Sequence, residues 1–134
     1  MEQETFYRLR NQDKIIAQMR VKGAQVFFSK DGFWWRGDEQ LHAQVKKGLF
    51  TMDEFSGLKD KNNRMLFAED IVQFKLGSLI KKKRTFRLSK VAGEIQVLPL
   101  FPGPQYQLHE IAVKPDLEWV SYAFLQGDIS HWGS

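Results

Sequence analysis

Hydrophobic residues along this chain gather in short runs separated by glycines and polar turn residues. The runs are rich in Phe, Val, Ile and Trp, residues that favour strands over helices. The clearest case is residues 25–35, in which two aromatic runs flank Asp31-Gly32. An Asp-Gly pair favours a tight hairpin turn because glycine accepts a positive φ without steric cost. The pattern predicts a mainly β protein with many turns.

One segment, residues 38–47, has the spacing of a helix instead. Asp38 is a suitable N-cap, Leu41 and Val45 lie four residues apart on one face, and Gly48 can end the segment. A helix this short persists only when it packs against other elements. The sequence therefore predicts one short helix.

Further strands are expected in the second half of the chain. Residues 85–89 alternate cleanly, so Phe86 and Leu88 share one face of the predicted strand and Arg87 and Ser89 share the other. Residues 93–98 alternate as well. Residues 106–113 and 117–125 are also interpreted as strands.

The fold expected from these elements is mainly β, with a small β-barrel formed chiefly by residues 50–125 and the single short helix. Residues 1–49 are expected to supply the N-terminal hairpin and the helix. Residues 50–134 are expected to form the barrel region, as one compact unit with the first.

A more specific pattern lies in residues 52–74. It resembles the hallmark segment of the YopX-like family of bacteriophage and prophage proteins, in which a phrase like "QFTGLKDKNGKEIYEGDIV" recurs. Glu69 departs from the phrase, which has glycine before its Asp-Ile-Val. The residues that agree with it are Phe55, Gly57, Leu58, Lys59, Asp60, Lys61, Asn62, Asp70, Ile71 and Val72.

The resemblance implies a small β-rich, barrel-containing protein that multimerises and is encoded by a phage or prophage. The function of that family is unsettled. Its shared residues have the character of turn and barrel residues, so the resemblance implies no catalytic role. The expectation is a phage or prophage accessory protein in the cytoplasm of a bacterial host.

The composition and the motifs of the chain exclude or disfavour several classes of function. The chain of 134 residues has no cysteine, which excludes disulfides and thiolate catalysis. His42, His109 and His131 show no spacing that would assemble a metal site, and the sequence has no nucleophile elbow, P-loop or dinucleotide fingerprint. No apolar run is long enough for a membrane helix, and the N-terminus does not resemble a secretory signal. We therefore expect a non-enzymatic protein with no cofactor, no metal and no membrane partner.

Charge is concentrated in one segment of the chain. Residues 75–90 hold seven basic residues and no acid, within a chain that has 20 Lys and Arg against 16 Asp and Glu. Such a segment can bind a phosphate backbone, or its lysines can keep a solvated hairpin from pairing edge to edge. The nucleic-acid hypothesis needs its basic side chains on one exposed face. These are Lys81, Lys82, Lys83, Arg84 and Arg87.

The leading hypothesis is a homo-oligomeric protein-interaction module. Four tryptophans exceed what a core of this size commonly needs, and aromatic side chains anchor interfaces. Trp34 and Trp35 point to opposite faces if residues 33–35 form a strand, so one of them is a candidate interface residue. Binding of nucleic acid through residues 75–90 is the alternative.

Overall fold

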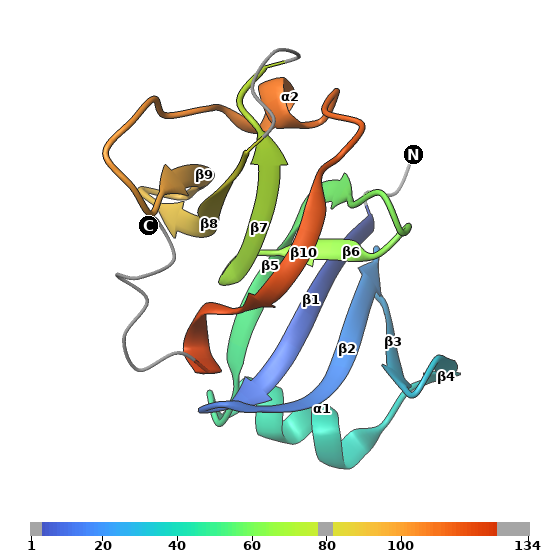
Figure 1. Ribbon diagram of the computed structural model, residues 1–134. Helices are drawn as coiled ribbons and strands as arrows, with labels where there is room; N and C mark the ends of the chain where they lie inside the picture. Colours follow the sequence, from blue (N-terminus) through green and yellow to red (C-terminus); the bar gives the residue numbers. More distant parts are fainter. Residues whose placement is uncertain (1–3, 78–81, 126–134) are drawn as a thin grey trace. The chain divides into compact units, whose positions relative to one another are not determined.

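Antiparallel strands joined by short turns make up most of the protein, which confirms the mainly β prediction. The computed structural model describes residues 4–77 and 82–125 (Figure 1). The chain divides into two compact units, Met1–Phe55 and Ser56–Ser134.

The first unit is a sheet with one helix packed on it. Its strand order is β4-β3-β2-β1-β5, each strand antiparallel to its neighbour. The elements are β1 (Glu4–Asn11), β2 (Lys14–Lys22), β3 (Gln25–Lys30), β4 (Phe33–Arg36), α1 (Glu39–Lys46) and β5 (Thr51–Lys59).

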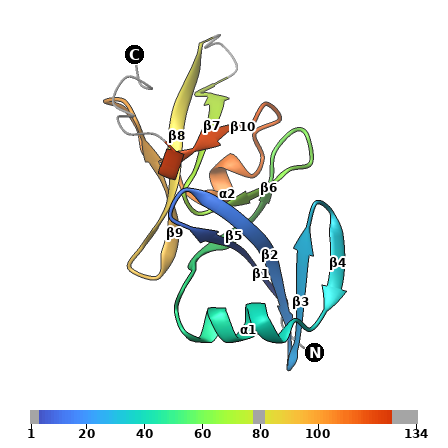
Figure 2. The same ribbon diagram turned by 90° about the horizontal axis from the view of Figure 1, so that it is seen from below.

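The helix α1 is the one that the sequence predicts. The Asp38 carboxylate caps it by accepting the Leu41 N–H at 3.0 Å, which satisfies one of the free donors of the first turn. Leu41 and Val45 pack against a buried cluster formed by Leu9, Met19 and Phe28 of the sheet. Figure 2 shows α1 running alongside these strands.

Strand β5 belongs to both units. Its first residues pair with β1, from Arg10 opposite Thr51 to Tyr7 opposite Glu54. Further along, the Ser56 hydroxyl donates to the Leu66 carbonyl at 2.6 Å, which joins β5 to β6 (Met65–Phe67). The division between the units thus falls inside a strand and not in a linker.

The second unit contains a four-stranded sheet with the order β10-β7-β8-β9. Two short helical segments follow β9 and β10 in the chain. Besides β6, its elements are β7 (Asp70–Lys75), β8 (Lys83–Val91), β9 (Glu94–Pro99), α2 (Leu108–Ile111), β10 (Glu118–Tyr122) and the 3-10 turn η1 (Ala123–Leu125).

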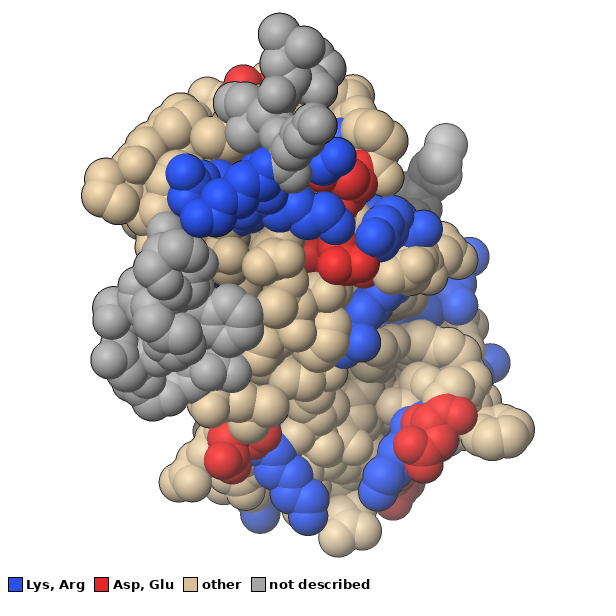
Figure 3. Space-filling view, viewed as in Figure 1, with Lys and Arg blue, Asp and Glu red and all other residues tan. Residues whose placement is uncertain are grey.

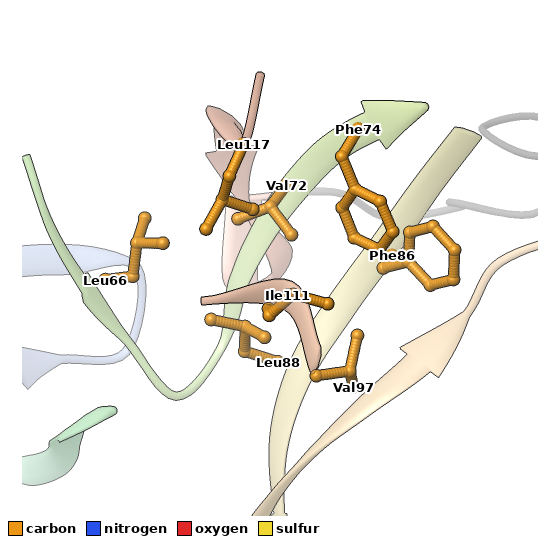
Figure 4. Close-up of a cluster of buried hydrophobic side chains, with 8 residues drawn as sticks. All are labelled: Leu66, Val72, Phe74, Phe86, Leu88, Val97, Ile111 and Leu117. Atoms are coloured by element: carbon orange, nitrogen blue, oxygen red, sulfur yellow. The ribbon is translucent and has the colours of Figure 1, made fainter. Parts of the chain in front are cut away.

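The core of the second unit lies on one face of this sheet (Figure 4). Phe74 and Phe86 stack with ring centroids 4.3 Å apart, and Tyr106 meets both rings edge-on. As predicted, Phe86 and Leu88 both point into the core from β8. The buried cluster is Leu66, Val72, Phe74, Phe86, Leu88, Val97, Ile111 and Leu117.

The predicted barrel is wrong, because the sheets of the described residues are open and do not close. The segment 106–113, expected as a strand, makes a single bridge between Tyr106 and Val97 and then turns into α2. The Glu110 carboxylate accepts the Gln107 N–H at 3.0 Å, which favours helix over strand there. With that strand replaced by a helix, β9 is an outer strand of this sheet among the described residues.

Candidate interaction surfaces

The hairpin formed by β3 and β4 is the clearest candidate surface in the first unit. Its turn residues Asp31 and Gly32 have φ of +57° and +85°, as expected for a two-residue turn that follows the twist of the strands. Among the described strands β4 pairs with β3 alone, so it is an outer strand of its sheet. Outer strands present an unpaired backbone edge to which another chain can add.

The two tryptophans of β4 point to opposite faces, as predicted. Trp35 packs on Phe28, with ring centroids 6.4 Å apart, and its Nε1 donates to the Asp38 carboxylate at 3.3 Å. Trp34 lies on the other face, where 42 % of the residue is exposed. Trp35 is therefore partly buried against the core, and Trp34 is the one available to a partner.

Phe33 is a further surface residue that the sequence interpretation missed. It is 78 % exposed, the second most exposed large hydrophobic residue among those described. Alternation places Phe33 on the same face as Trp35, which suggests burial. However, Phe33 is the first residue of β4, next to the turn, and packs against neither buried cluster. The sequence feature that could have indicated this surface residue is the run of three consecutive aromatic residues directly after the turn.

A groove of about 400 Å³ lies next to this hairpin. The pairing of β2 with β3 extends only to Gln18 opposite Ser29, so the first residues of β2 are not paired with β3. Ile15, Ala17 and Trp34 line the groove together with the turn residues. This groove is large enough to accept a side chain from a partner.

The basic residues predicted to share one face are divided in the structure. Arg84 points to the core side of β8, where its guanidinium lies 5.3 Å from the centre of the Phe101 ring. Lys83 and Arg87 point to the opposite side, since each is an odd number of residues from Arg84. Lys82 is exposed, and Lys81 lies outside the described residues.

Acidic side chains face the basic ones on that opposite side. The Arg87 guanidinium bonds to the Glu69 carboxylate, and Lys83 Nζ lies 3.9 Å from the Glu118 carboxylate. Figure 3 shows Lys and Arg side chains gathered as a band with Asp and Glu side chains beside them. Part of the positive charge of this segment is therefore balanced within the chain.

Glu118 has a second, closer partner in Lys61, whose Nζ lies 2.8 Å away. The hydrogen bond and charge of Glu118 raise the pKa of Lys61, and those of Lys61 lower the pKa of Glu118. Both groups are therefore held in their charged forms over the physiological range. Because the pair is exposed to solvent, it organises the surface more than it stabilises the fold.

Asp60, in the segment that carries the family resemblance, joins the turn after β5 to the start of β10. Its carboxylate accepts the N–H groups of Asn62, Arg64 and Trp119, each at 2.9 Å. Burial alone raises the pKa of Asp60, but these backbone donors and the nearby Arg64 charge outweigh it and lower that pKa below 3.8. The presence of Asp60 is therefore explained by its structural role in joining these two segments.

The other shared acid, Asp70, is buried and accepts the Phe67 N–H at 2.8 Å. Glu69 before it has a φ of +73°, a backbone conformation that glycine adopts without strain. This is the position at which the YopX-like phrase has glycine. These residues shape the turn between β6 and β7 and point to no chemistry.

The described residues contain no cluster of three His, Asp or Glu side chains that could hold a metal ion. His42 lies in α1 and His109 in α2, on different units, while His131 lies outside the described residues. None of the described helices is long and apolar enough to cross a membrane.

In comparisons with known proteins, no family model matches the chain and no curated protein matches it.

Proposed function

We propose that this protein is a non-enzymatic interaction module that associates with a second copy of itself through the outer strand β4. The observation that carries the proposal is the exposed aromatic edge formed by Phe33 and Trp34. A role as a phage or prophage accessory protein, which the resemblance implies, is part of the same proposal.

The composition of β4 supports this function. Proteins that remain monomeric usually protect an outer strand with charge, proline or a covering loop. In β4, by contrast, three aromatic residues are followed by a single charge at Arg36. Aromatic residues are also the side chains most enriched at the centres of interfaces.

A second copy is the partner that this strand fits best. Antiparallel pairing of β4 with its counterpart places the same strand on both sides, as a two-fold interface requires. Registers that keep the alternation of the pleat bring Trp34 against either Trp34 or Arg36 of the other copy. The first is an aromatic pair and the second a cation–π pair, and both stabilise sheets.

The test is the molar mass in solution, measured by light scattering and by sedimentation velocity. We expect the wild-type chain to show a multiple of 15.7 kDa. The double variant Phe33→Glu/Trp34→Glu is expected to return the mass to 15.7 kDa, because it replaces the aromatic side chains that the interface would bury with charged groups that protect an outer strand.

The matched control is Val113→Glu, since Val113 is 79 % exposed but lies in the second unit. It removes a similar exposed apolar group and is expected to leave the mass unchanged. A wild-type chain that stays at 15.7 kDa, or a multiple that persists in the folded double variant, would contradict the proposal.

Binding of nucleic acid through residues 75–90 has less support. The hypothesis needs five basic side chains on one free face, and Arg84 points to the core side of β8 while Arg87 is bonded to Glu69. Lys75 and Lys83 do lie directly opposite each other, so some positive charge remains on that hairpin.

A further inference from the structure

Aromatic rings and guanidinium groups alternate across four strands of the first unit. The register places Phe6 of β1 opposite Arg20 of β2, Arg20 opposite Phe27 of β3, and Phe27 opposite Arg36 of β4. Residues that lie opposite each other share a face of the sheet. These four side chains, here called the Arg–Phe ladder, therefore lie on the face of the sheet opposite the buried cluster and α1.

The members of the Arg–Phe ladder are in contact. The Arg20 guanidinium lies 5.8 Å from the centre of the Phe6 ring and 5.4 Å from the centre of the Phe27 ring. Phe6 also meets Trp34 edge-on, with centroids 6.2 Å apart. Phe6, Arg20 and Phe27 are half-buried and Arg36 and Trp34 are exposed, so the ladder and Trp34 form one continuous row of accessible aromatic and cationic side chains.

This surface carries more positive than negative charge. Arg36 is exposed, the Arg20 side chain is 33 % exposed, and Lys22 lies on the same face one row away. Glu4, which lies opposite Lys22, bonds to Arg20 at 2.8 Å and offsets part of this charge. Three cations facing one anion favour a polyanionic ligand.

From this arrangement we infer that the Arg–Phe ladder binds single-stranded nucleic acid. Unpaired bases stack on aromatic rings and on the planes of guanidinium groups, while phosphates pair with Arg and Lys. A duplex keeps its bases stacked internally and can use only the cations. A ligand with both flat rings and regularly spaced negative charge is therefore the one that this face matches.

This inference is independent of self-association and uses a different surface from residues 75–90. The proposed contact between copies follows the backbone edge of β4 and shares Arg36 with the ladder, whereas Phe6 and Arg20 lie on β1 and β2, away from that edge. It also explains why arginine, with its flat guanidinium, stands at both cationic positions of the ladder, where lysine would supply the same charge.

The test is the fluorescence anisotropy of a labelled oligothymidylate of about 20 nucleotides, titrated with the full chain between about 50 and 300 mM salt. We expect binding at low salt that weakens as salt is added. The variant Arg20→Gln/Arg36→Gln is expected to reduce the slope of log K against log salt by about 1.4, because single strands release about 0.7 counterion per contact.

A gain of affinity provides a test that misfolding cannot imitate. Glu4→Gln removes the acid that neutralises Arg20 and is expected to tighten binding several-fold. The matched control Glu94→Gln removes an exposed acid from the second unit and is expected to leave binding unchanged. Arg20→Lys keeps the charge but not the flat stacking surface, so the salt slope should persist while affinity falls roughly tenfold.

Two results would overturn the inference. One is no binding of the oligonucleotide at the lowest salt. The other is binding that survives Arg20→Gln/Arg36→Gln but is lost in Lys75→Gln/Lys83→Gln, which would assign it to the β7–β8 hairpin. A duplex that binds as tightly as the single strand would show a purely electrostatic surface and reject the stacking part. Molar mass measured on Arg20→Lys and Glu4→Gln, neither of which changes β4, keeps this outcome separate from that of the proposed self-association.

Discussion

Asp60 holds together two segments that are far apart in the chain. Its two carboxylate oxygens satisfy the N–H groups of Asn62 and Arg64 in its own turn and that of Trp119 at the start of β10. An asparagine at this position has one oxygen acceptor in place of two. Its side-chain NH2 group would face at least one of these backbone N–H donors, and two donors cannot bond to each other. Asp60→Asn is therefore expected to destabilise the fold by about 1–3 kcal/mol in urea unfolding at neutral pH. Asp13→Asn, at an exposed turn, is the matched control and should change stability little.

The same carboxylate predicts a dependence on pH. Because the folded-state pKa of Asp60 lies below its ordinary value of 3.8, the charged form favours the folded state. Its contribution is complete above pH 3.8 and is lost as pH falls through the lower folded-state pKa. The stability difference between wild type and Asp60→Asn should shrink over that acid range, which urea unfolding at a series of pH values would detect. A difference that stays constant to the lowest pH would show that hydrogen bonding without charge is responsible.

At the level of elements, α1 depends on the N-cap residue that precedes it. Asp38 caps the helix at the Leu41 N–H and also accepts the Trp35 Nε1–H, so it connects the helix to β4. Asp38→Ala is expected to cost about 1–2 kcal/mol and to shift the tryptophan fluorescence, since Trp35 loses its partner. Thermal unfolding measures the first effect. Glu39→Ala, in the same turn but without these bonds, should lower the stability by about a few tenths of a kcal/mol at most.

Elements determined by nearby residues could be predicted from the sequence. The hairpin of β3 and β4 depends on Asp31-Gly32, and α1 depends on Asp38 and two apolar residues four positions apart. The segment 106–113 could not be predicted in the same way. Its apolar pattern fits a strand, but the contact of Glu110 with the Gln107 backbone makes it a helix.

The candidate surfaces, too, could be predicted only as far as they depend on residues close together in the sequence. Trp34 was predicted as one of two alternatives, and the choice between Trp34 and Trp35 depends on which face the helix covers. The Arg–Phe ladder was not foreseen because its members come from four strands and meet only through the register. Likewise, the bond of Arg87 to Glu69 joins residues 18 positions apart and leaves no local pattern.

At the level of the whole molecule, the described residues form a buried cluster in each of the two units. Phe86→Ala removes a ring that stacks on Phe74 and is expected to cost about 3–5 kcal/mol. Hydrogen exchange should then show faster exchange in β7 and β8 before any change in β2 and β3. Phe28→Ala should produce the opposite order. Equal loss of protection in all four strands in either variant would mean that the two units unfold as one.

The joining of the units through β5 limits how this protein can vary. Side chains along a strand alternate between faces, so inserting one residue near Phe55 would invert one half of β5 relative to the other. A loop between two domains accepts insertions of any length, whereas this junction accepts only changes that preserve parity. The two halves are therefore not exchangeable cassettes, and a related protein that replaced one of them would need a crossover point outside residues 51–59.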